Sequence, residues 1–167
     1  MAIVVSDTSP IRALGHLGLV GVLRDLYGEV LVPPAVAAEL LNPASGLGAL
    51  DVRLFAFVRV QAPTISEGAG RVPHTLDAGE FEALTLALEV GAQVVLIDEA
   101  KGRAAARKLG LVPVGVLGTL LRAKLRGLIP AIGPLIVRLQ GELRFFVSER
   151  LRLDILRDAG ELPEDDE

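Results

Sequence analysis

Residues 3–10 read Ile3-Val4-Val5-Ser6-Asp7-Thr8-Ser9-Pro10, and this stretch decides the fold class. The run from Ala2 to Ser6 is short, apolar and β-branched, which predicts a buried strand. Ser9 and Pro10 predict that a helix opens next, because proline suits the first helical turn. The chain therefore starts with a strand and a helix, and Asp7 stands between them.

The same alternation continues along the chain. Further strands are expected at 29–32, 57–61, 93–97 and 111–114. Helices are expected at 18–27, 34–41, 78–90, 99–109, 116–126, 133–142 and 148–159, and 64–75 is expected to be an exposed loop. Strands that alternate with helices form parallel βαβ units with right-handed crossovers. The sequence therefore predicts an α/β fold, a three-layer α/β/α sandwich whose central parallel sheet has four or five strands.

Length and composition bound the organisation. The 167 residues fit one domain, which we place at residues 1–160 with C-terminal helices at about 131–159 packing on it, followed by an acidic tail at 161–167. The chain has no cysteine, which excludes disulfides and thiol catalysis and fits a reducing compartment. The N-terminus lacks the basic stretch of a signal peptide, and no apolar run is long enough to span a bilayer. We therefore expect a cytoplasmic protein without a membrane segment.

The apolar content predicts a partner surface. Hydrophobic residues make up 51% of the chain before its 18 glycines are counted, which is more than a soluble domain of average composition has. We expect a homodimer, since closed two-fold dimers are the commonest way to cover such surface. The candidate contact residues are Leu14, Leu17, Leu19, Val22, Leu23, Leu135, Val137, Leu139, Phe145 and Phe146.

Four acids are placed to meet. Asp7 and Asp98 each follow a predicted buried strand, and ligands of open parallel sheets bind beyond the carboxyl ends of the strands. Glu39 lies on the helix after the second strand. Glu80 lies in the first turn of the helix that leads to the Asp98 strand, three residues after the expected N-cap Asp77, and Gly91 is expected to close that helix. Thr8 and Ser9 add hydroxyl groups that can orient Asp7 or a water molecule.

Four clustered carboxylates repel one another, and a divalent cation relieves that repulsion. With no cysteine and only two histidines, His16 and His74, any metal must be held by oxygen, which points to Mg²⁺, Mn²⁺ or Ca²⁺. Such an ion can activate a water molecule, hold a phosphate oxygen and stabilise the leaving oxygen. Phosphodiester hydrolysis needs these three contributions.

The acidic motifs also resemble a known family. The opening residues 3–10 look like the first motif of PIN-domain ribonucleases, the fold of VapC-type toxins. Residues 37–40, 76–83 and 95–99 resemble the second, third and fourth motifs in order and approximate spacing. Residues 115–127 further resemble a PIN subgroup of predicted nucleic-acid-binding proteins that are often encoded beside a small antitoxin. One departure is Glu80, because most PIN domains have the shorter aspartate there.

The resemblance implies an endoribonuclease that uses Mg²⁺ or Mn²⁺, cuts RNA and has an inhibitory antitoxin as partner. In this interpretation Asp7, Glu39, Glu80 and Asp98 are catalytic and metal-binding, with a metal-activated water as nucleophile. Lys101, Arg103 and Arg107, on the helix after Asp98, are candidates for binding RNA phosphates or for a solvated basic face.

Other interpretations stay open. Each acid has a structural alternative as a helix cap or solvated position, and Glu99 is better explained by a helix N-terminus than as an extra acid of the site. A PIN-like binding or scaffold module with inactive acids is the main alternative function. An aspartyl-phosphate phosphatase is disfavoured, because it needs an acid two residues after the nucleophile and Ser9 stands there.

Overall fold

A computed structural model describes residues 2–42, 48–64 and 70–162 of the chain. The chain divides into two compact units, residues 1–115 and 116–167, which we describe one at a time. The first unit holds the sheet and the predicted acids. In the described residues no helix is long and apolar enough to cross a membrane.

The first unit is built on one parallel sheet in the order β3-β2-β1-β4-β5. The strands are β1 (Val4–Ser6), β2 (Val30–Val32), β3 (Val58–Val60), β4 (Val94–Leu96) and β5 (Pro113–Val114). Strand β1 is central, and Val5 pairs with Leu31 of β2 on one side and with Val95 of β4 on the other. The predicted parallel sheet of four or five strands is confirmed, with five strands.

Helices and the 3₁₀ turn η1 lie in the connections between these strands. They are α1 (Thr8–Leu17), α2 (Gly21–Tyr27), α3 (Pro34–Leu41), η1 (Val52–Leu54), α4 (Ala78–Val90) and α5 (Ala100–Lys108). The predicted signals for α4 are confirmed: the N–H of Glu80 donates to the Asp77 carboxylate at 2.8 Å, and Gly91 ends the helix at a φ of 64°. The turn η1 was not predicted; in it, the Asp51 carboxylate accepts a hydrogen bond from the N–H of Arg53.

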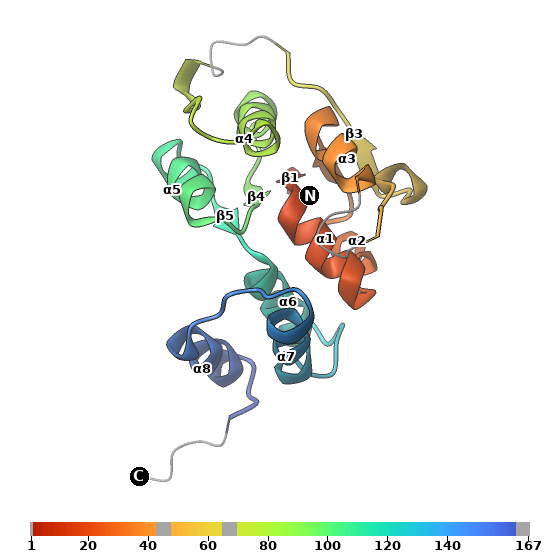
Figure 1. Ribbon diagram of the computed structural model, residues 1–167, viewed down its shortest axis with the longest axis vertical. Coiled ribbons are helices and arrows are strands. Elements are labelled where there is room, and N and C mark those ends of the chain that lie inside the picture. The colour runs from red at the N-terminus through yellow and green to blue at the C-terminus, as the bar shows by residue number, and fades with distance from the viewer. Residues whose placement is uncertain (1, 43–47, 65–69, 163–167) are drawn as a thin grey trace. The chain divides into compact units, whose positions relative to one another are not determined.

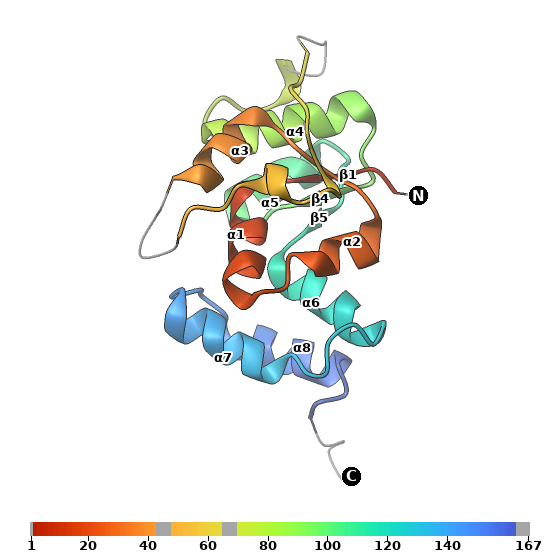
Figure 2. The same cartoon turned by 90° about the vertical axis from the view of Figure 1, so that its right-hand side faces the viewer.

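Helices cover both faces of the sheet. Buried side chains of α4 and α5 pack against Val5, Leu31, Val95 and Ile97 to form one core cluster. Figures 1 and 2 show α1 and α2 on the other side of the strands from α4. The five consecutive residues 83–87 of α4 are all buried, because this helix packs on α3 as well as on β1 and β4. The three-layer α/β/α sandwich is therefore confirmed.

The described part of the second unit, residues 116–162, contains three helices, α6 (Val116–Leu125), α7 (Gly133–Glu142) and α8 (Glu149–Asp158). Glu161, which follows α8, connects to the end of α6 and the start of α7. Its carboxylate accepts from the N–H groups of Ile132 at 2.8 Å and Gly133 at 2.9 Å, and Nζ of Lys124 lies 3.6 Å from Oε2. Burial opposes ionisation of Glu161, but these partners outweigh it and leave the pKa below its ordinary value. Glu161, placed at the start of the expected tail, thus caps α7, and residues 163–167 lie outside the described part.

Several residues that were expected to form the dimer contact are buried inside the folded chain. Among the N-terminal candidates, Leu14, Leu17, Val22 and Leu23 are buried in the folded chain and offer no surface to a partner. Their helical spacing identified an apolar stripe, but a stripe facing the interior has the same spacing as one facing a partner. Of the C-terminal candidates, Leu139 is also buried, whereas Val137 and Phe146 are 68% and 87% exposed.

The expected loop at 64–75 is described only in part, since residues 65–69 lie outside the described ranges. Its C-terminal half is not uniformly exposed, because Val72 is buried and belongs to the core cluster. His74 stacks on Phe81 of α4 with ring centroids 5.1 Å apart. The segment before Asp77 is therefore fixed to α4.

Candidate active site

Asp7 occupies the carboxyl end of the central strand. Its N–H donates to the carbonyl of Leu96 at 2.8 Å, which continues the ladder between β1 and β4 for one more residue. The side chain is only 5% exposed. Asp7 is the N-cap residue of α1, yet its carboxylate makes no capping hydrogen bond. The structural alternative of a helix cap therefore does not explain this acid.

Glu39 is brought to Asp7 by contacts between α1 and α3. The hydroxyl of Thr8 donates to Oε2 of Glu39 at 2.8 Å. One turn further along α1, Nη2 of Arg12 donates to the carbonyl oxygens of Glu39 at 2.8 Å and Asn42 at 3.3 Å. Thr8 thus orients the Glu39 carboxylate, and Arg12 holds the C-terminal end of the helix that carries it.

Gly79 lies where three carboxylates converge. A Cβ atom at this position would stand 3.1 Å from Oε2 of Glu39, 3.2 Å from Oδ1 of Asp7 and 3.5 Å from Oδ1 of Asp77. The first two distances are shorter than ordinary contact with a methyl group. The first turn of α4 therefore approaches the acids closely because it carries no side chain at position 79.

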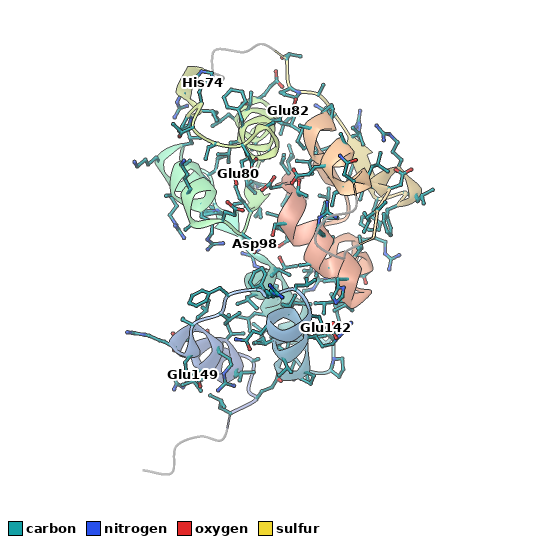
Figure 3. All side chains as sticks on the ribbon, viewed as in Figure 1. His74, Glu80, Glu82, Asp98, Glu142 and Glu149 are labelled. Carbon is teal, nitrogen blue, oxygen red and sulfur yellow. The ribbon has the colours of Figure 1, made fainter. Side chains whose placement is uncertain are left out.

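Glu80 follows directly and is 3% exposed. Its Oε2 atom faces α5, where a Cβ on Gly102 would stand 3.3 Å away. Helix α4 is anchored in this position by Glu82, whose carboxylate accepts from the N–H of Ala35 in the first turn of α3 at 2.8 Å. Figure 3 shows Glu80 and Asp98 in the region bordered by α1, α4 and α5.

The environment holds protons on two of the acids. Burial is the main cause that raises the pKa of Asp7 from 3.8 to about 7. A hydrogen bond from the Thr8 backbone opposes the shift, while the charges of Asp77, Glu39 and Glu99 add to it. Asp7 therefore carries a proton for part of the time at neutral pH when no cation is near.

Glu80 is affected more strongly. Its pKa is raised from 4.5 to about 8, mainly by burial. The charge of Asp77, a hydrogen bond with Asp77 and the charges of Asp7 and Glu99 contribute the rest of this increase. Buried carboxyl groups with raised pKa values are typical of functional sites, where neighbouring like charges oppose ionisation. A positive charge delivered to this region would release both protons.

Asp98 has different neighbours from the other three acids. Its Oδ2 atom accepts from the hydroxyl of Ser9 at 3.1 Å. A Cβ on Gly115 would stand 2.8 Å from its Oδ1 atom and 3.1 Å from Nη1 of Arg103. The structure thus brings Asp7, Glu39 and Glu80 together and places Asp98 beside a hydroxyl group and a guanidinium group. Ser9 links the two sets, since it is two residues from Asp7.

Two acids belong to the cluster although sequence reasoning gave them another role. Asp77 was expected only as the N-cap of α4, and it also lies against Gly79 and Glu80. Glu99 was expected in the first turn of α5. It is instead the N-cap residue, makes no capping bond, and its charge raises the pKa of Asp7 and Glu80. Their positions in the sequence could have indicated this role, because Asp77 lies one helical turn before Glu80 and Glu99 directly follows Asp98.

The three basic candidates differ in availability. The ammonium group of Lys101 donates to the carbonyl of Thr75 at 3.2 Å, which ties α5 to the segment before α4. Arg103 is half-buried and donates to the carbonyl of Ile97 at 3.2 Å. Burial and the charge of Arg107 lower the pKa of Arg103, and Asp98 opposes this. Arg107 is exposed and shares this face, as its spacing predicted.

The candidate ligands have the right chemistry for a hard divalent cation, but their arrangement does not enclose one. All candidate ligands are carboxylate or hydroxyl oxygens, which Mg²⁺ and Mn²⁺ prefer. In residues 2–42, 48–64 and 70–162, no group of three or more acids or histidines is arranged to hold a metal ion. Mg²⁺ commonly binds through one or two carboxylates and keeps several water molecules. The cluster fits that mode and does not form a closed protein cage.

Comparison with known protein families finds a match over most of the chain. The family model DUF3368, described as a PIN domain, matches residues 3–161. None of the curated proteins compared with the chain matches it. PIN domains are in general nucleases, which bind nucleic acid and typically use divalent metals. Since the match covers both the sheet and the three C-terminal helices, the chain belongs to the PIN-domain family.

Proposed function

We propose that the protein is a Mg²⁺- or Mn²⁺-dependent endoribonuclease and the toxin of a toxin–antitoxin pair. The observation that carries this proposal is the convergence of Asp7 and Glu39 on the turn of α4 at Gly79, beside the buried Glu80. Three elements that are far apart in sequence supply these carboxylates. A site that concentrates acids at a sheet end suits the hydrolysis of an anionic backbone only when a cation is present.

Asp7, Glu39, Glu80 and Asp98 would hold the cation, directly or through water. When bound, the cation supplies positive charge that lowers the pKa of a water molecule and offsets the charge of the phosphate. Asp7 and Glu80 contribute by giving up protons in exchange, since their pKa values are about 7 and about 8 without it. Cation affinity should therefore rise with pH across this range.

Neighbouring residues fix the acids in place. Thr8 holds the Glu39 carboxylate and Ser9 holds the Asp98 carboxylate, each by one hydrogen bond. Such partners orient metal ligands and affect activity when they are removed. Arg103 and Arg107 lie on the face of α5 beside Asp98 and provide positive charge for flanking phosphates of the RNA.

The organisation that we propose is one PIN-like domain at residues 1–160 in a cytoplasmic protein, paired with a small antitoxin. We also propose a homodimer, now without the buried N-terminal leucines and valines as its contacts. Among the contact candidates that are not buried, Val137 and Phe146 are the most exposed. Light scattering at micromolar concentration tests the dimer: a mass that stays near 17.6 kDa would exclude it.

Cleavage of single-stranded RNA by the purified full chain tests the activity. We expect cleavage with Mg²⁺ or Mn²⁺, none in excess EDTA, and none by Asp7→Asn with either metal. The exposed Asp158→Asn, at the end of α8, serves as the matched control and should cleave like wild type. Full cleavage in EDTA would exclude the metal mechanism.

The competing proposal is a PIN-like module that binds nucleic acid without cutting it. It draws support from the absence, in the described residues, of three acids arranged around one point as metal ligands. Calorimetric titration with Mn²⁺ separates the two proposals. Binding that is lost in Asp7→Asn favours the nuclease, and no binding at millimolar Mn²⁺ together with intact RNA binding favours the module.

A further inference from the structure

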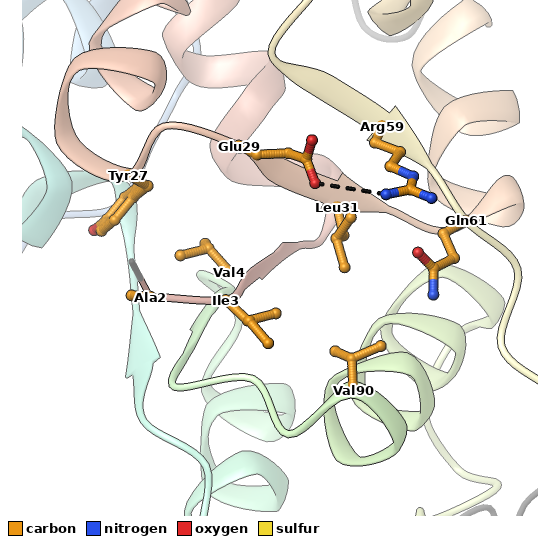
Figure 4. A pocket seen from close by; sticks show the side chains of 9 residues that line it. All are labelled: Ala2, Ile3, Val4, Tyr27, Glu29, Leu31, Arg59, Gln61 and Val90. Atoms are coloured by element: carbon orange, nitrogen blue, oxygen red, sulfur yellow. Dashed lines mark ion pairs between the residues drawn. The ribbon is translucent and has the colours of Figure 1, made fainter.

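A cavity of about 420 Å³ lies at the other end of the sheet from the acids. It opens where β1 and β2 begin, beside the edge strand β3 and the C-terminal end of α4 (Figure 4). Small-molecule sites typically have volumes of roughly 300–1,000 Å³, so this cavity is of a suitable size. Its lining residues are Ala2, Ile3, Val4, Tyr27, Glu29, Leu31, Arg59, Gln61 and Val90.

The strand geometry explains why these side chains share one face. Side chains two residues apart along a strand point to the same face of a sheet. Glu29 and Leu31 are related in this way, and so are Arg59 and Gln61. Leu31 pairs with Arg59 across β2 and β3, which places the two pairs side by side. The face that α4 covers further along the sheet is open at this end.

The cavity combines an apolar floor with polar walls. Leu31, Ile3 and Val90 supply aliphatic surface, and Glu29 faces Arg59 across the opening. Their closest oxygen and nitrogen atoms are 3.9 Å apart, and the side chains are 58% and 66% exposed. This distance is too long for a hydrogen bond, and so exposed an ion pair contributes little to stability.

Glu29 and Arg59 therefore keep hydrogen-bonding capacity. Within the described part of the chain, the side chains of Glu29, Arg59 and Gln61 make no hydrogen bond to protein. Together they present a carboxylate acceptor, a forked donor and an amide around an apolar surface. A planar ligand with donors and acceptors on adjacent edges would match this set of groups.

We propose that this cavity binds a guanine base. The ring would cover the floor formed by Ile3 and Leu31. Arg59 would donate to O6 and N7, the edge that arginine commonly contacts in guanine. Glu29 would accept from N1–H and from the exocyclic amino group on the neighbouring edge, as in the recognition of unpaired bases through their Watson–Crick edges.

The other bases satisfy the walls less well. In the same position, adenine places its amino group where O6 of guanine would accept from Arg59, so two donors face each other and only N7 accepts. Its N1 is an acceptor that faces the Glu29 carboxylate, and it has no amino group on that edge. Pyrimidines lack the N7 edge and cover less of the floor. A site that leaves a polar partner unpaired rejects the wrong ligand more strongly than apolar contact selects the right one. Guanine should therefore bind about tenfold or more tightly than adenine.

This proposal does not depend on the nuclease activity. Asp7 lies four residues beyond Ile3 along β1, which is about 13 Å. The base bound here is thus not the one at the acids. The same guanine chemistry can be presented by a free guanosine nucleotide or by an unpaired guanine of RNA.

Tyr27 gives a direct readout, because it lines the cavity and is the only tyrosine of the chain. The full chain is labelled with ¹³C-tyrosine and titrated in EDTA with guanosine and adenosine monophosphate. A second arm uses short single-stranded RNAs with and without a central guanine. We expect saturable shifts of the Tyr27 ring signals with guanosine monophosphate at about tenfold lower concentration than with adenosine monophosphate.

Variants connect the signal to the walls. Arg59→Ala and Glu29→Gln should each weaken guanosine monophosphate binding about tenfold. Arg150→Ala, an exposed arginine on α8, is the matched control and should bind as wild type. Shifts with the nucleotide but not the RNA assign the site to free nucleotides, and shifts with the guanine-containing RNA assign it to RNA. No shift with any ligand at millimolar concentration, equal binding of both nucleotides, or an unaffected Arg59→Ala would overturn the proposal.

Discussion

Replacing Asp7 by asparagine should make the metal-free protein more stable at alkaline pH and less dependent on pH. The folded-state pKa of Asp7 is about 7, against 3.8 for an ordinary aspartate. A raised pKa means that the native state binds more protons than the unfolded state between these values. The contribution of Asp7 to the free energy of unfolding is therefore most favourable below pH 4 and declines as the pH rises towards 7.

The size of the effect follows from the shift. One pKa unit corresponds to 1.36 kcal/mol, so Asp7 should lower the free energy of unfolding by about 3 kcal/mol between pH 5 and pH 8. Structural relaxation around a buried charge makes this value an upper limit. Asparagine keeps the size of the side chain and cannot ionise, so this loss should be absent in Asp7→Asn.

Urea unfolding in EDTA at pH 5 and pH 8, followed by far-ultraviolet circular dichroism, measures this directly. Wild type should lose stability between the two values, and Asp7→Asn should lose about 2–3 kcal/mol less. The slope that remains belongs to Glu80, whose pKa is about 8, and adding Glu80→Gln should reduce it further. Asp158→Asn controls for loss of charge alone. An equal loss in wild type and Asp7→Asn would refute the buried, like-charged environment described for Asp7.

Three further predictions concern neighbouring contacts. Gly79→Ala should weaken Mn²⁺ binding about tenfold or more in calorimetric titration, because the new methyl group meets Asp7 and Glu39 at 3.2 and 3.1 Å; unchanged binding would show that this turn need not approach the acids. Thr8→Val should reduce the cleavage rate about tenfold and change the free energy of unfolding by about 1 kcal/mol, because it removes the hydrogen bond to Glu39. Thr8→Ser keeps this bond and should therefore cleave at the wild-type rate. Equal cleavage rates of the two variants would argue against an orienting role of Thr8. Glu161→Gln should cost about 1–2 kcal/mol of stability at pH 7 in urea unfolding, since it removes the charge that caps α7. The folded-state pKa of Glu161 is lowered, so the contribution is present at neutral pH and lost on acidification, and a variant with the same acid sensitivity as wild type would contradict this.

Local patterns predicted the elements and the approximate position of the acids. Asp77 and Gly91 marked both ends of α4, because capping depends on residues that are close in sequence. The ends of β1 and β4 gave Asp7 and Asp98, since parallel strands in one sheet share a direction. Such local patterns could not predict contacts between elements that are far apart in the sequence. The order of the strands, the bond from Thr8 to Glu39, and the pairing of Asp98 with Ser9 all depend on packing.

The glycines show the same limit. Gly79 and Gly102 look like ordinary residues of a helix. Only the fold shows that Gly79 leaves room for carboxylates, and that Gly102 leaves room for the side chain of Ile97 with the Glu80 carboxylate beside it. The burial of Leu14 and Leu23 was likewise decided by what the helices face.

Because β1 lies in the middle of the sheet, the sheet around it cannot be completed until late in the synthesis of the chain. Strand β1 leaves the ribosome first, but its partner in β4 lies 90 residues later, as the bond between Ile3 and Gln93 shows. At roughly 5–20 residues per second, several seconds of translation separate the two strands. Glu80 is also made in that interval, so a nascent chain carries Asp7 without its neighbours. A chain that is still being translated therefore cannot assemble the acid cluster until β4 has joined the sheet.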